Sequence, residues 1–243
     1  MQRYFAKSII DDKVFLYDED IHHIKHVMRM SNTDIIQVVY DKKLYKACID
    51  NLVNNDIRIV EQIEQIDDKY PDICLIIPAL KEQKMDYILQ KGTEIGIKQF
   101  IVAPFERSVV KYDDRKKNVK LNRWEKICKE ASEQSMRVDI PIISIENNLD
   151  FIDKLDGIKL ICSTNEKEHY IKYALKKISD YDKLFIVIGP EGGISDMEET
   201  YYIEKGFKKV SLGSQIMRVE TVPIFLASVI RYEFTEWFIW GNL

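Results

Sequence analysis

Cysteine is scarce in this 243-residue chain, and its four cysteines are too far apart in sequence to suggest a compact site. They stand at positions 48, 74, 128 and 162, and no CxxC pair occurs. This spacing disfavours a disulfide framework and a zinc site, and it is typical of unpaired thiols in a reducing cytosol. We therefore expect a cytoplasmic protein.

Long apolar runs are also lacking. The first ten residues contain no extended apolar core of the kind that a signal peptide needs. The most apolar stretch, residues 224–240, is interrupted by Arg231, Glu233 and Glu236. It therefore predicts a helix packed in the core and not a membrane span.

The chain also lacks an excess of positive charge. The 36 basic and 40 acidic residues give a net charge of −4, which disfavours a general binder of polyanions. Residues 107–123 are a local exception, with seven basic and two acidic residues, 7 − 2 = +5. By itself, a charged and loop-like segment of this kind indicates a solvated surface. The basic residues are Arg107, Lys111, Arg115, Lys116, Lys117, Lys120 and Arg123.

Histidine occurs only four times. His22 and His26 are four residues apart on a predicted helix, which is a spacing used by metal ligands. No third ligand or partnering glutamate accompanies them, so we expect surface or packing histidines and no metal site.

Two glycine-bearing loops give the chain its clearest functional pattern. Residues 184–188 predict a buried strand that breaks at the sequence Gly-Pro-Glu-Gly-Gly of residues 189–193. Ser195 and Glu198 form a capping-box pattern, which predicts a helix that ends at Gly206. A second short strand then leads into the loop of residues 213–221.

This arrangement predicts a ligand site, because ligands of open α/β sheets bind beyond the carboxyl ends of the strands. Neither a GxGxxG fingerprint nor the GK[ST] of a P-loop is present, so the common nucleotide motifs are excluded.

The loop sequences IGPEGGISDME and LGSQIMRVETV resemble those of the SPOUT superfamily of knotted, S-adenosylmethionine-dependent RNA methyltransferases. They are most similar to the family that methylates N3 of a uridine in small-subunit (16S) ribosomal RNA. Gln215, Met217 and Val222 replace the Arg, Leu and Ala of the family pattern. Further similar segments are residues 3–5 (RYF), 23–29, 91–97 and the predicted helix 122–137.

The resemblance implies an α/β fold with two domains. Residues 1–70 would form a small PUA-like β-barrel that binds RNA, and residues 71–243 a SPOUT methyltransferase domain with a deep trefoil knot. The residues agree with this division, since short strands with polar turns give way after the polar segment 64–72 to alternating strands and helices. Gly92 departs from the family pattern inside a predicted helix, where glycine costs helix stability.

The resemblance also implies the site. The cofactor would be S-adenosylmethionine, bound by Ser163, Thr164, Gly189, Pro190, Glu191, Gly192, Gly193, Leu212, Gly213, Ile216 and Met217. No metal is needed, because the sulfonium carries its own leaving group. The candidate catalytic residues are Arg218, Glu220 and Glu191. A salt bridge between Glu220 and Arg218 or another arginine, and a structural role for Glu191 near a helix N-terminus, are the competing interpretations.

The implied partner is 16S ribosomal RNA, within the small ribosomal subunit. Beside the two loops, the basic stretch becomes a candidate for phosphate contact. The RNA-binding residues expected are Arg3, His23, Arg29, Arg107, Lys116, Lys117, Lys120, Arg123 and Arg137. A homodimer is implied as well. Its surface would be the apolar C-terminal helix, whose aromatic residues could equally fill the core of the monomer: Phe225, Phe234, Trp237, Phe238 and Trp240.

Two alternatives stay open at this stage. One is the same fold acting on another RNA position, such as the ribose 2′-O or a different base. The other is a noncatalytic protein that binds RNA or a small nucleotide, which the acidic balance and Gln215 favour.

Overall fold

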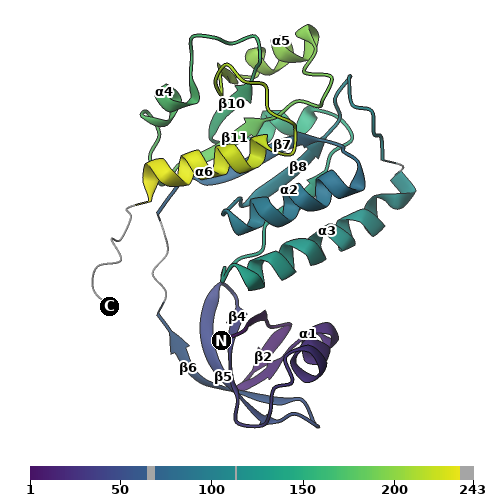
Figure 1. The fold of residues 1–243 in the computed structure, drawn as a ribbon, viewed down its shortest axis with the longest axis vertical. Coiled ribbons are helices and arrows are strands. Elements are labelled where there is room, and N and C mark those ends of the chain that lie inside the picture. The colour runs from purple at the N-terminus through teal and green to yellow at the C-terminus, as the bar shows by residue number, and fades with distance from the viewer. Residues whose placement is uncertain (65–68, 113, 236–243) are drawn as a thin grey trace. The chain divides into compact units, whose positions relative to one another are not determined.

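The described residues of the computed structural model, 1–64, 69–112 and 114–235, divide into two units (Figure 1). The first unit comprises Met1–Asp67 together with Lys129–Ile140, and the second comprises Asp68–Cys128 and Pro141–Leu243. No sequence pattern indicated that residues 129–140 join the first unit. The aromatic residues Trp237, Phe238 and Trp240 lie outside the described residues.

The first unit is built on a six-stranded sheet with the order β1-β4-β5-β6-β3-β2. Its core is mostly aliphatic, with Ile24, Ile36, Ile49 and Ile57 at most 1% exposed. The strands are β1 (Arg3–Phe5), β2 (Ser8–Ile10), β3 (Lys13–Phe15), β4 (Ile35–Tyr40), β5 (Lys43–Asn51) and β6 (Asp56–Ile63), with the helix α1 (Asp18–His22) and the π-helical turn η1 (His23–Val27).

The β4–β5 hairpin shows why polar turns were informative. Asp41 and Lys42 have φ angles of 49° and 57°, and Tyr40 pairs with Lys43 across the turn. Two consecutive left-handed residues form the tight turn whose twist matches that of the strands. The sequence Tyr-Asp-Lys of residues 40–42 is one of the polar turns expected between the short strands, and it is confirmed. In contrast, β1 and β2, of three residues each, were not predicted.

A buried ion cluster lies within the first unit. The Lys129 ammonium contacts Asp20 Oδ1 at 2.6 Å and Glu133 Oε1 at 2.7 Å, and the backbone N–H of Phe5 donates to Glu133 at 3.2 Å. Burial raises the pKa of both Asp20 and Glu133. For Lys129, burial acts to lower the pKa, but the two carboxylates outweigh it and the pKa is raised. The cluster attaches the end of a long helix to the sheet of this unit.

The second unit is organised around a parallel sheet with the order β12-β10-β11-β7-β8-β9. β7 and β11 are central, and the continuous apolar runs of their sequences are buried, as parallel sheets covered on both faces require. The strands are β7 (Asp72–Pro78), β8 (Gln99–Ala103), β9 (Ile142–Ile145), β10 (Ile158–Cys162), β11 (Lys183–Val187) and β12 (Lys208–Val210).

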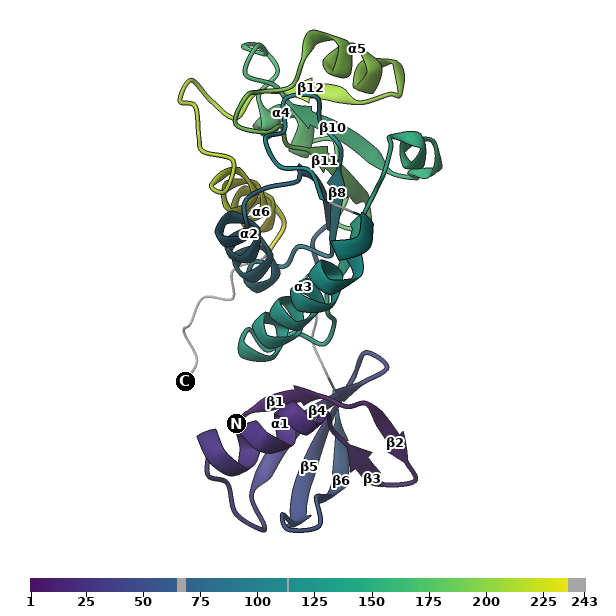
Figure 2. The same ribbon diagram turned by 90° about the vertical axis from the view of Figure 1, so that its right-hand side faces the viewer.

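Helices alternate with these strands, and α2 and α6 lie side by side (Figures 1 and 2). The helices are α2 (Glu82–Glu94), α3 (Asp114–Gln134), α4 (Ile171–Leu175), α5 (Asp196–Glu204) and α6 (Val222–Phe234), with the 3₁₀ turn η2 (Asp150–Lys154). Within the described ranges, no helix is both long and apolar enough to cross a membrane.

The structure corrects one prediction, because α3 begins at Asp114 and not at residue 122. Much of the basic stretch is therefore helical and not a loop. Residues 114–121 contain no glycine or proline, and the Arg and Lys among them are good helix formers. Trp124 fixes the helix in the second unit, since it is 1% exposed and its ring lies 5.5 Å from that of Tyr112.

Close packing explains why glycine stands at position 92 inside a helix. A Cβ atom at this position would lie 2.7 Å from Ile97 Cδ1 and 2.8 Å from a ring carbon of Phe100. The glycine therefore lets α2 approach β8, and this close packing offsets its low helix propensity.

Candidate active site

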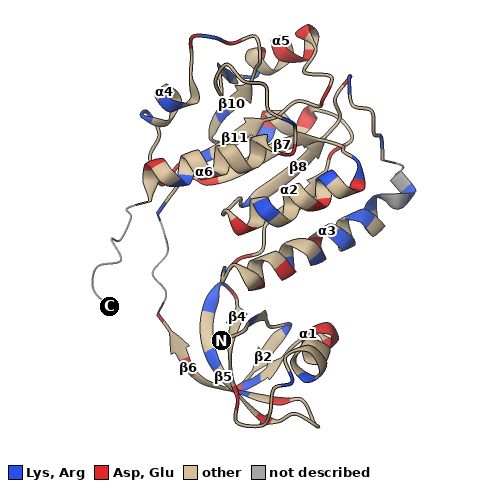
Figure 3. Ribbon diagram, in the orientation of Figure 1, with Lys and Arg blue, Asp and Glu red and all other residues tan. Residues whose placement is uncertain are grey.

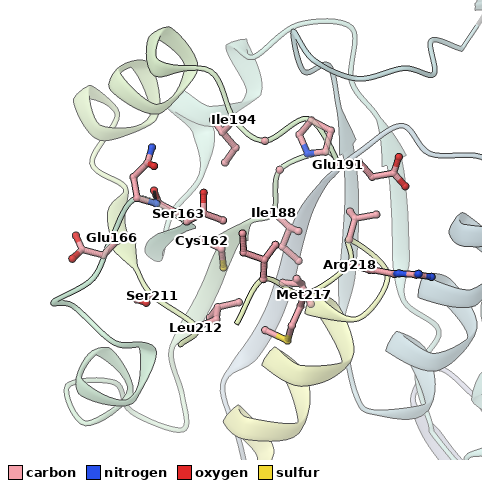
Figure 4. Close-up of a pocket in the computed structure, with 18 of the residues that line it drawn as sticks. Cys162, Ser163, Glu166, Ile188, Glu191, Ile194, Ser211, Leu212, Met217 and Arg218 are labelled. Carbon is pink, nitrogen blue, oxygen red and sulfur yellow. Dashed lines mark hydrogen bonds between the residues drawn. The ribbon is translucent and has the colours of Figure 1, made fainter. Parts of the chain in front are cut away.

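A pocket of about 990 Å³ opens where β10, β11 and β12 end (Figure 4). These three strands are parallel neighbours, so the segments that leave their carboxyl ends meet at one edge of the sheet. The pocket is lined by the β10–α4 loop (residues 163–170), the β11–α5 loop (residues 188–195) and the β12–α6 loop (residues 211–221). Every residue predicted to bind the cofactor lies in one of these loops, and the structure brings all of them to this pocket.

The β11–α5 loop turns sharply away from the sheet. Gly193 has a φ of 74°, and its N–H donates to the Pro190 carbonyl at 2.9 Å. The Ser195 side chain accepts from the Glu198 N–H, and the Glu198 carboxylate accepts from the Ser195 N–H, so the predicted capping box is confirmed. This turn leaves backbone groups along the pocket wall, with Ile188 at the base (Figure 4).

The β12–α6 loop forms the facing wall. Gly213 has a φ of 118° and nothing lies within 4 Å of where a Cβ would stand, so the backbone conformation alone favours glycine here. Leu212 and Met217 are half-buried in the lining. Ile216 is 84% exposed, so it lies at the rim.

The β10–α4 loop contributes the predicted Ser163 and, in addition, Glu166, which the sequence reasoning missed. Ser163 is buried, and its Oγ accepts from the Asn165 N–H at 3.2 Å. Glu166 Oε1 accepts from the backbone N–H groups of Glu168, at 2.8 Å, and His169, at 3.0 Å. These bonds lower the pKa of Glu166 to about 2. Its carboxylate is therefore charged, and it stabilises the loop by accepting the two backbone hydrogen bonds. The run of polar residues directly after a buried strand was the available signal.

One end of the pocket is charged, and Lys84 of α2 is its centre. The Lys84 ammonium contacts Glu191 and also lies 3.1 Å from Glu220. The bond to Glu191, and then that to Glu220, raise the pKa of Lys84. Burial acts to raise the pKa of Glu220, but the backbone N–H of Glu220 and the Lys84 ammonium outweigh it, and the pKa is lowered. Both loop carboxylates are thus paired with one lysine.

The prediction that Glu220 pairs with Arg218 or another arginine is therefore wrong. Glu220 turns toward the α2 lysine, 136 positions earlier in the chain, and Arg218 is exposed. Arg218 still acts on Glu220 through charge, since it helps to lower the pKa of that carboxyl. In Figure 4, Arg218 and Glu191 lie on one side of the pocket and Ser163 and Glu166 on the other.

Arg107 also lines the charged end. Its guanidinium donates to the Gly192 carbonyl at 3.2 Å, and a Cβ on Gly192 would lie 3.1 Å from Arg107 Cβ. The absence of a side chain at Gly192 therefore leaves room for Arg107. The hydrogen bond between them holds the segment that contains Arg107 against the β11–α5 loop.

The other residues predicted to bind RNA are more dispersed. Arg3 is 7% exposed and donates to Gln37 Oε1 at 2.8 and 3.0 Å, so it supports the sheet and is not open to RNA. Arg137 is mostly enclosed and pairs with Asp139 at 3.0 Å. His23 shares a hydrogen bond of 2.9 Å with the Tyr4 hydroxyl, whereas Arg29 is exposed.

The basic residues of α3 are partly used within the fold (Figure 3). Arg123 pairs with Glu82 and Asp86, and Lys117 donates to Asn147. Lys120 lies over the Tyr112 ring, at 4.9 Å from its centroid. The side chain of Lys116 lies outside the described residues.

No group of three potential metal ligands occurs among the described residues. The rings of His22 and His26 do lie together, with centroids 4.6 Å apart. No carboxylate or cysteine completes a ligand set with them in this part of the chain.

Comparison with known proteins covers both units. Residues 68–231 match the model of an RNA methyltransferase domain, and residues 16–57 match that of an RNA methyltransferase PUA domain. The ribosomal RNA small subunit methyltransferase E of Bacillus subtilis (strain 168) is 34% identical, over 96% of this chain and 97% of that protein. The protein of the same name from Mesomycoplasma hyopneumoniae (strain 232) is 29% identical, over 93% and 97%.

One solved structure is similar to this chain over nearly its whole length. It is a ribosomal RNA small subunit methyltransferase E from Neisseria gonorrhoeae bound to S-adenosyl methionine. The TM-score is 0.84 at 26% sequence identity, over 98% of this chain and 99% of that one. The predicted mixed α/β class and the PUA-like character of the N-terminal part are confirmed.

Proposed function

Because this chain belongs to the same family of RNA methyltransferases as the Bacillus subtilis small subunit methyltransferase E, we propose that it methylates small-subunit (16S) ribosomal RNA, with S-adenosylmethionine as the methyl donor. The proposed target atom is N3 of a uridine. The observation that carries this proposal is the convergence of three strand-end loops on one pocket with a charged end.

The residues of the pocket fit S-adenosylmethionine. Its size suits a nucleoside, and its apolar side chains, such as Ile188, Leu212 and Met217, suit an adenine ring. Gly189 shows how tightly the wall is built, since a Cβ there would lie 2.5 Å from Ile194 Cγ1. The residues proposed to hold the cofactor are Ser163, Thr164, Gly189, Pro190, Glu191, Gly192, Gly193, Leu212, Gly213, Ile216 and Met217.

When bound, this cofactor supplies a methyl group on a sulfonium that needs no further activation. The protein then has to position the target base and to manage the N3 proton of uracil, which must leave before or during attack. Arg218 is the proposed catalytic residue, because an exposed guanidinium at the charged end can stabilise the uracil anion through a carbonyl oxygen. Glu191 and Glu220 remain candidates for the base, but their pairing with Lys84 favours a positioning role.

The N-terminal part would add RNA affinity. We propose that residues 1–70 form a PUA-like β-barrel and residues 71–243 a SPOUT domain with a trefoil knot. A homodimer and action within the small ribosomal subunit, in the cytoplasm, complete the proposal. The exposed Arg29, together with Arg107 and the α3 residues Lys116, Lys117, Lys120 and Arg123, are proposed to contact RNA.

Methyl transfer from labelled S-adenosylmethionine tests this proposal. Deproteinised small-subunit rRNA and intact small subunits would be incubated with the protein in parallel. The proposal predicts incorporation into the RNA of at least one of them, and the better substrate gives the assembly state that the protein recognises. Absence of incorporation into both would contradict it and would favour a noncatalytic RNA-binding protein.

A further inference from the structure

The α4 surface is a group of six side chains that extends from the rim of the pocket. It consists of Lys167, Tyr170, Lys172, Tyr173, Lys176 and Lys177. All six are exposed, and Lys167 and Tyr170 also line the pocket. In Figure 3, basic positions follow one another along α4 and the turn after it.

Its charge stands out from that of the whole chain. Residues 167–177 contain four lysines and one glutamate, 4 − 1 = +3, in a protein with a net charge of −4. Among the residues that the structure describes, no carboxylate pairs with any of these four ammonium groups. Arg123 of α3 differs, since it is paired with two carboxylates. The α4 surface therefore holds positive charge that the fold itself does not neutralise.

Two tyrosines lie among these lysines. Tyr170 is 43% exposed and Tyr173 is 58% exposed, and their rings meet edge to face with centroids 6.4 Å apart. Exposed aromatic faces between cations are the arrangement on which the bases of single-stranded nucleic acid stack while phosphates meet the cations.

The backbone holds this surface against the pocket. The Ile171 N–H donates to the Ser211 carbonyl at 2.9 Å, and the Ser211 N–H donates to the His169 carbonyl at 2.8 Å. Ile171 and Leu175 are at most 5% exposed and anchor α4 in the core. The surface is thus fixed to the β12–α6 loop, at the rim of the pocket.

We propose that the α4 surface binds the single-stranded RNA that flanks the target nucleotide. The lysines contact phosphates and the tyrosines stack on unpaired bases. This inference rests on the proposed function, because it assigns a further part of the RNA substrate to a surface beside the same pocket.

The lysines are tested through the salt dependence of binding to deproteinised small-subunit rRNA. For Lys172→Gln/Lys176→Gln, the slope of log K against log salt should become shallower by about 1.4, at about 0.7 per lost phosphate contact with a single strand. The control is Lys205→Gln/Lys209→Gln in the same unit, whose lysines pair with Asp153 and Glu199. Its slope should match that of the wild type. Equal slopes for all three proteins would overturn the proposal.

Tyr173 is tested separately from charge. Tyr173→Ala should lower RNA affinity by about tenfold at an unchanged salt slope, and Tyr173→Phe should retain wild-type affinity because it keeps the ring. Wild-type affinity in the alanine variant, or a loss in both variants, would contradict stacking. Analytical sedimentation of each variant tests whether the α4 surface binds a second copy of this chain instead of RNA. A change in oligomeric state on substitution would show that it does, and would overturn the proposal.

Activity and binding of the wild type distinguish a failure of the proposed function from a failure of the α4 proposal. If the wild-type protein transfers no methyl group to rRNA and does not bind it, the proposed function fails and this inference fails with it. If the wild type does both and the α4 variants behave like it, only the inference about α4 fails.

Discussion

The Lys84 ammonium lies 3.1 Å from the Glu220 carboxylate, which ties α2 to the β12–α6 loop across the charged end of the pocket. The same ammonium contacts Glu191 of the β11–α5 loop. One lysine therefore sets the spacing of two loops that carry proposed cofactor contacts. It also forms an ion pair with the carboxylates of both Glu191 and Glu220.

Replacing Lys84 with methionine should weaken the binding of S-adenosylmethionine more than it weakens the fold. The side chains of Lys84 and Glu191 are 31% and 55% exposed, so solvent screens this ion pair and it should contribute little to the free energy of unfolding. Calorimetric titration should show cofactor affinity about tenfold lower, and Lys84→Arg should restore part of it. Lys205→Met removes a comparable ion pair, with Asp153, and should leave that affinity unchanged.

Gly213 and Gly206 form a matched pair for testing the β12–α6 loop. Both have positive φ angles, 118° and 87°, and at neither position does an atom lie within 4 Å of where a Cβ would stand. Alanine at either position should therefore lower the free energy of unfolding by about 1–3 kcal/mol through backbone strain. Only Gly213→Ala should also weaken the binding of S-adenosylmethionine. Equal cofactor affinity in the two variants would show that Gly213 does not shape the site.

The buried cluster in the first unit predicts a pH-dependent stability. Lys129→Met leaves the Asp20 and Glu133 carboxylates buried without their cation, which should cost about 3–5 kcal/mol of unfolding free energy at neutral pH. Burial already raises the pKa of both carboxyls above their unfolded values, and loss of the cation raises it further. The folded variant then binds more protons than its unfolded form, so stability should return in part as the pH falls from 7 to about 5.

Urea unfolding at the two pH values measures this effect. Lys46→Met is the control in the same unit, because its partner Glu61 is 58% exposed and the pair should contribute less than about 1 kcal/mol. A Lys129 variant whose stability falls steadily on acidification would contradict the role given to the cluster.

Arg218 is tested by its kinetics. Arg218→Ala should lower the single-turnover rate of methyl transfer by about 100-fold, as loss of one group that stabilises a developing anion does. RNA and cofactor affinities and thermal stability should change little, because the side chain is exposed and Glu220 pairs with Lys84 instead. A more alkaline pH should recover part of the rate by favouring the uracil anion. An unchanged rate across pH would remove Arg218 from the mechanism.

Local patterns made part of this structure predictable. The capping box at Ser195 and the turn at Asp41 and Lys42 depend only on neighbouring residues, so their sequences specify them. The loops at β11 and β12 were predictable for the same reason, as glycine and proline mark where a strand must end.

Contacts between distant residues were not predictable in this way. Lys84 is 107 residues from Glu191, and no local pattern in α2 marks it as part of the site. Gly92 looks like a defect in a helix until Phe100 is seen packed against it. The start of α3 was placed too late because its first residues are charged and lack an apolar stripe, although the absence of glycine and proline was a usable signal.

The identity of the methylated nucleoside tests the central claim most directly. After incubation with the protein and S-adenosylmethionine, small-subunit rRNA would be digested to nucleosides and separated by liquid chromatography with mass detection. We predict 3-methyluridine, which is absent when the cofactor is left out. A 2′-O-methyl nucleoside, a methyl group on a different base, or no methylated product would contradict it.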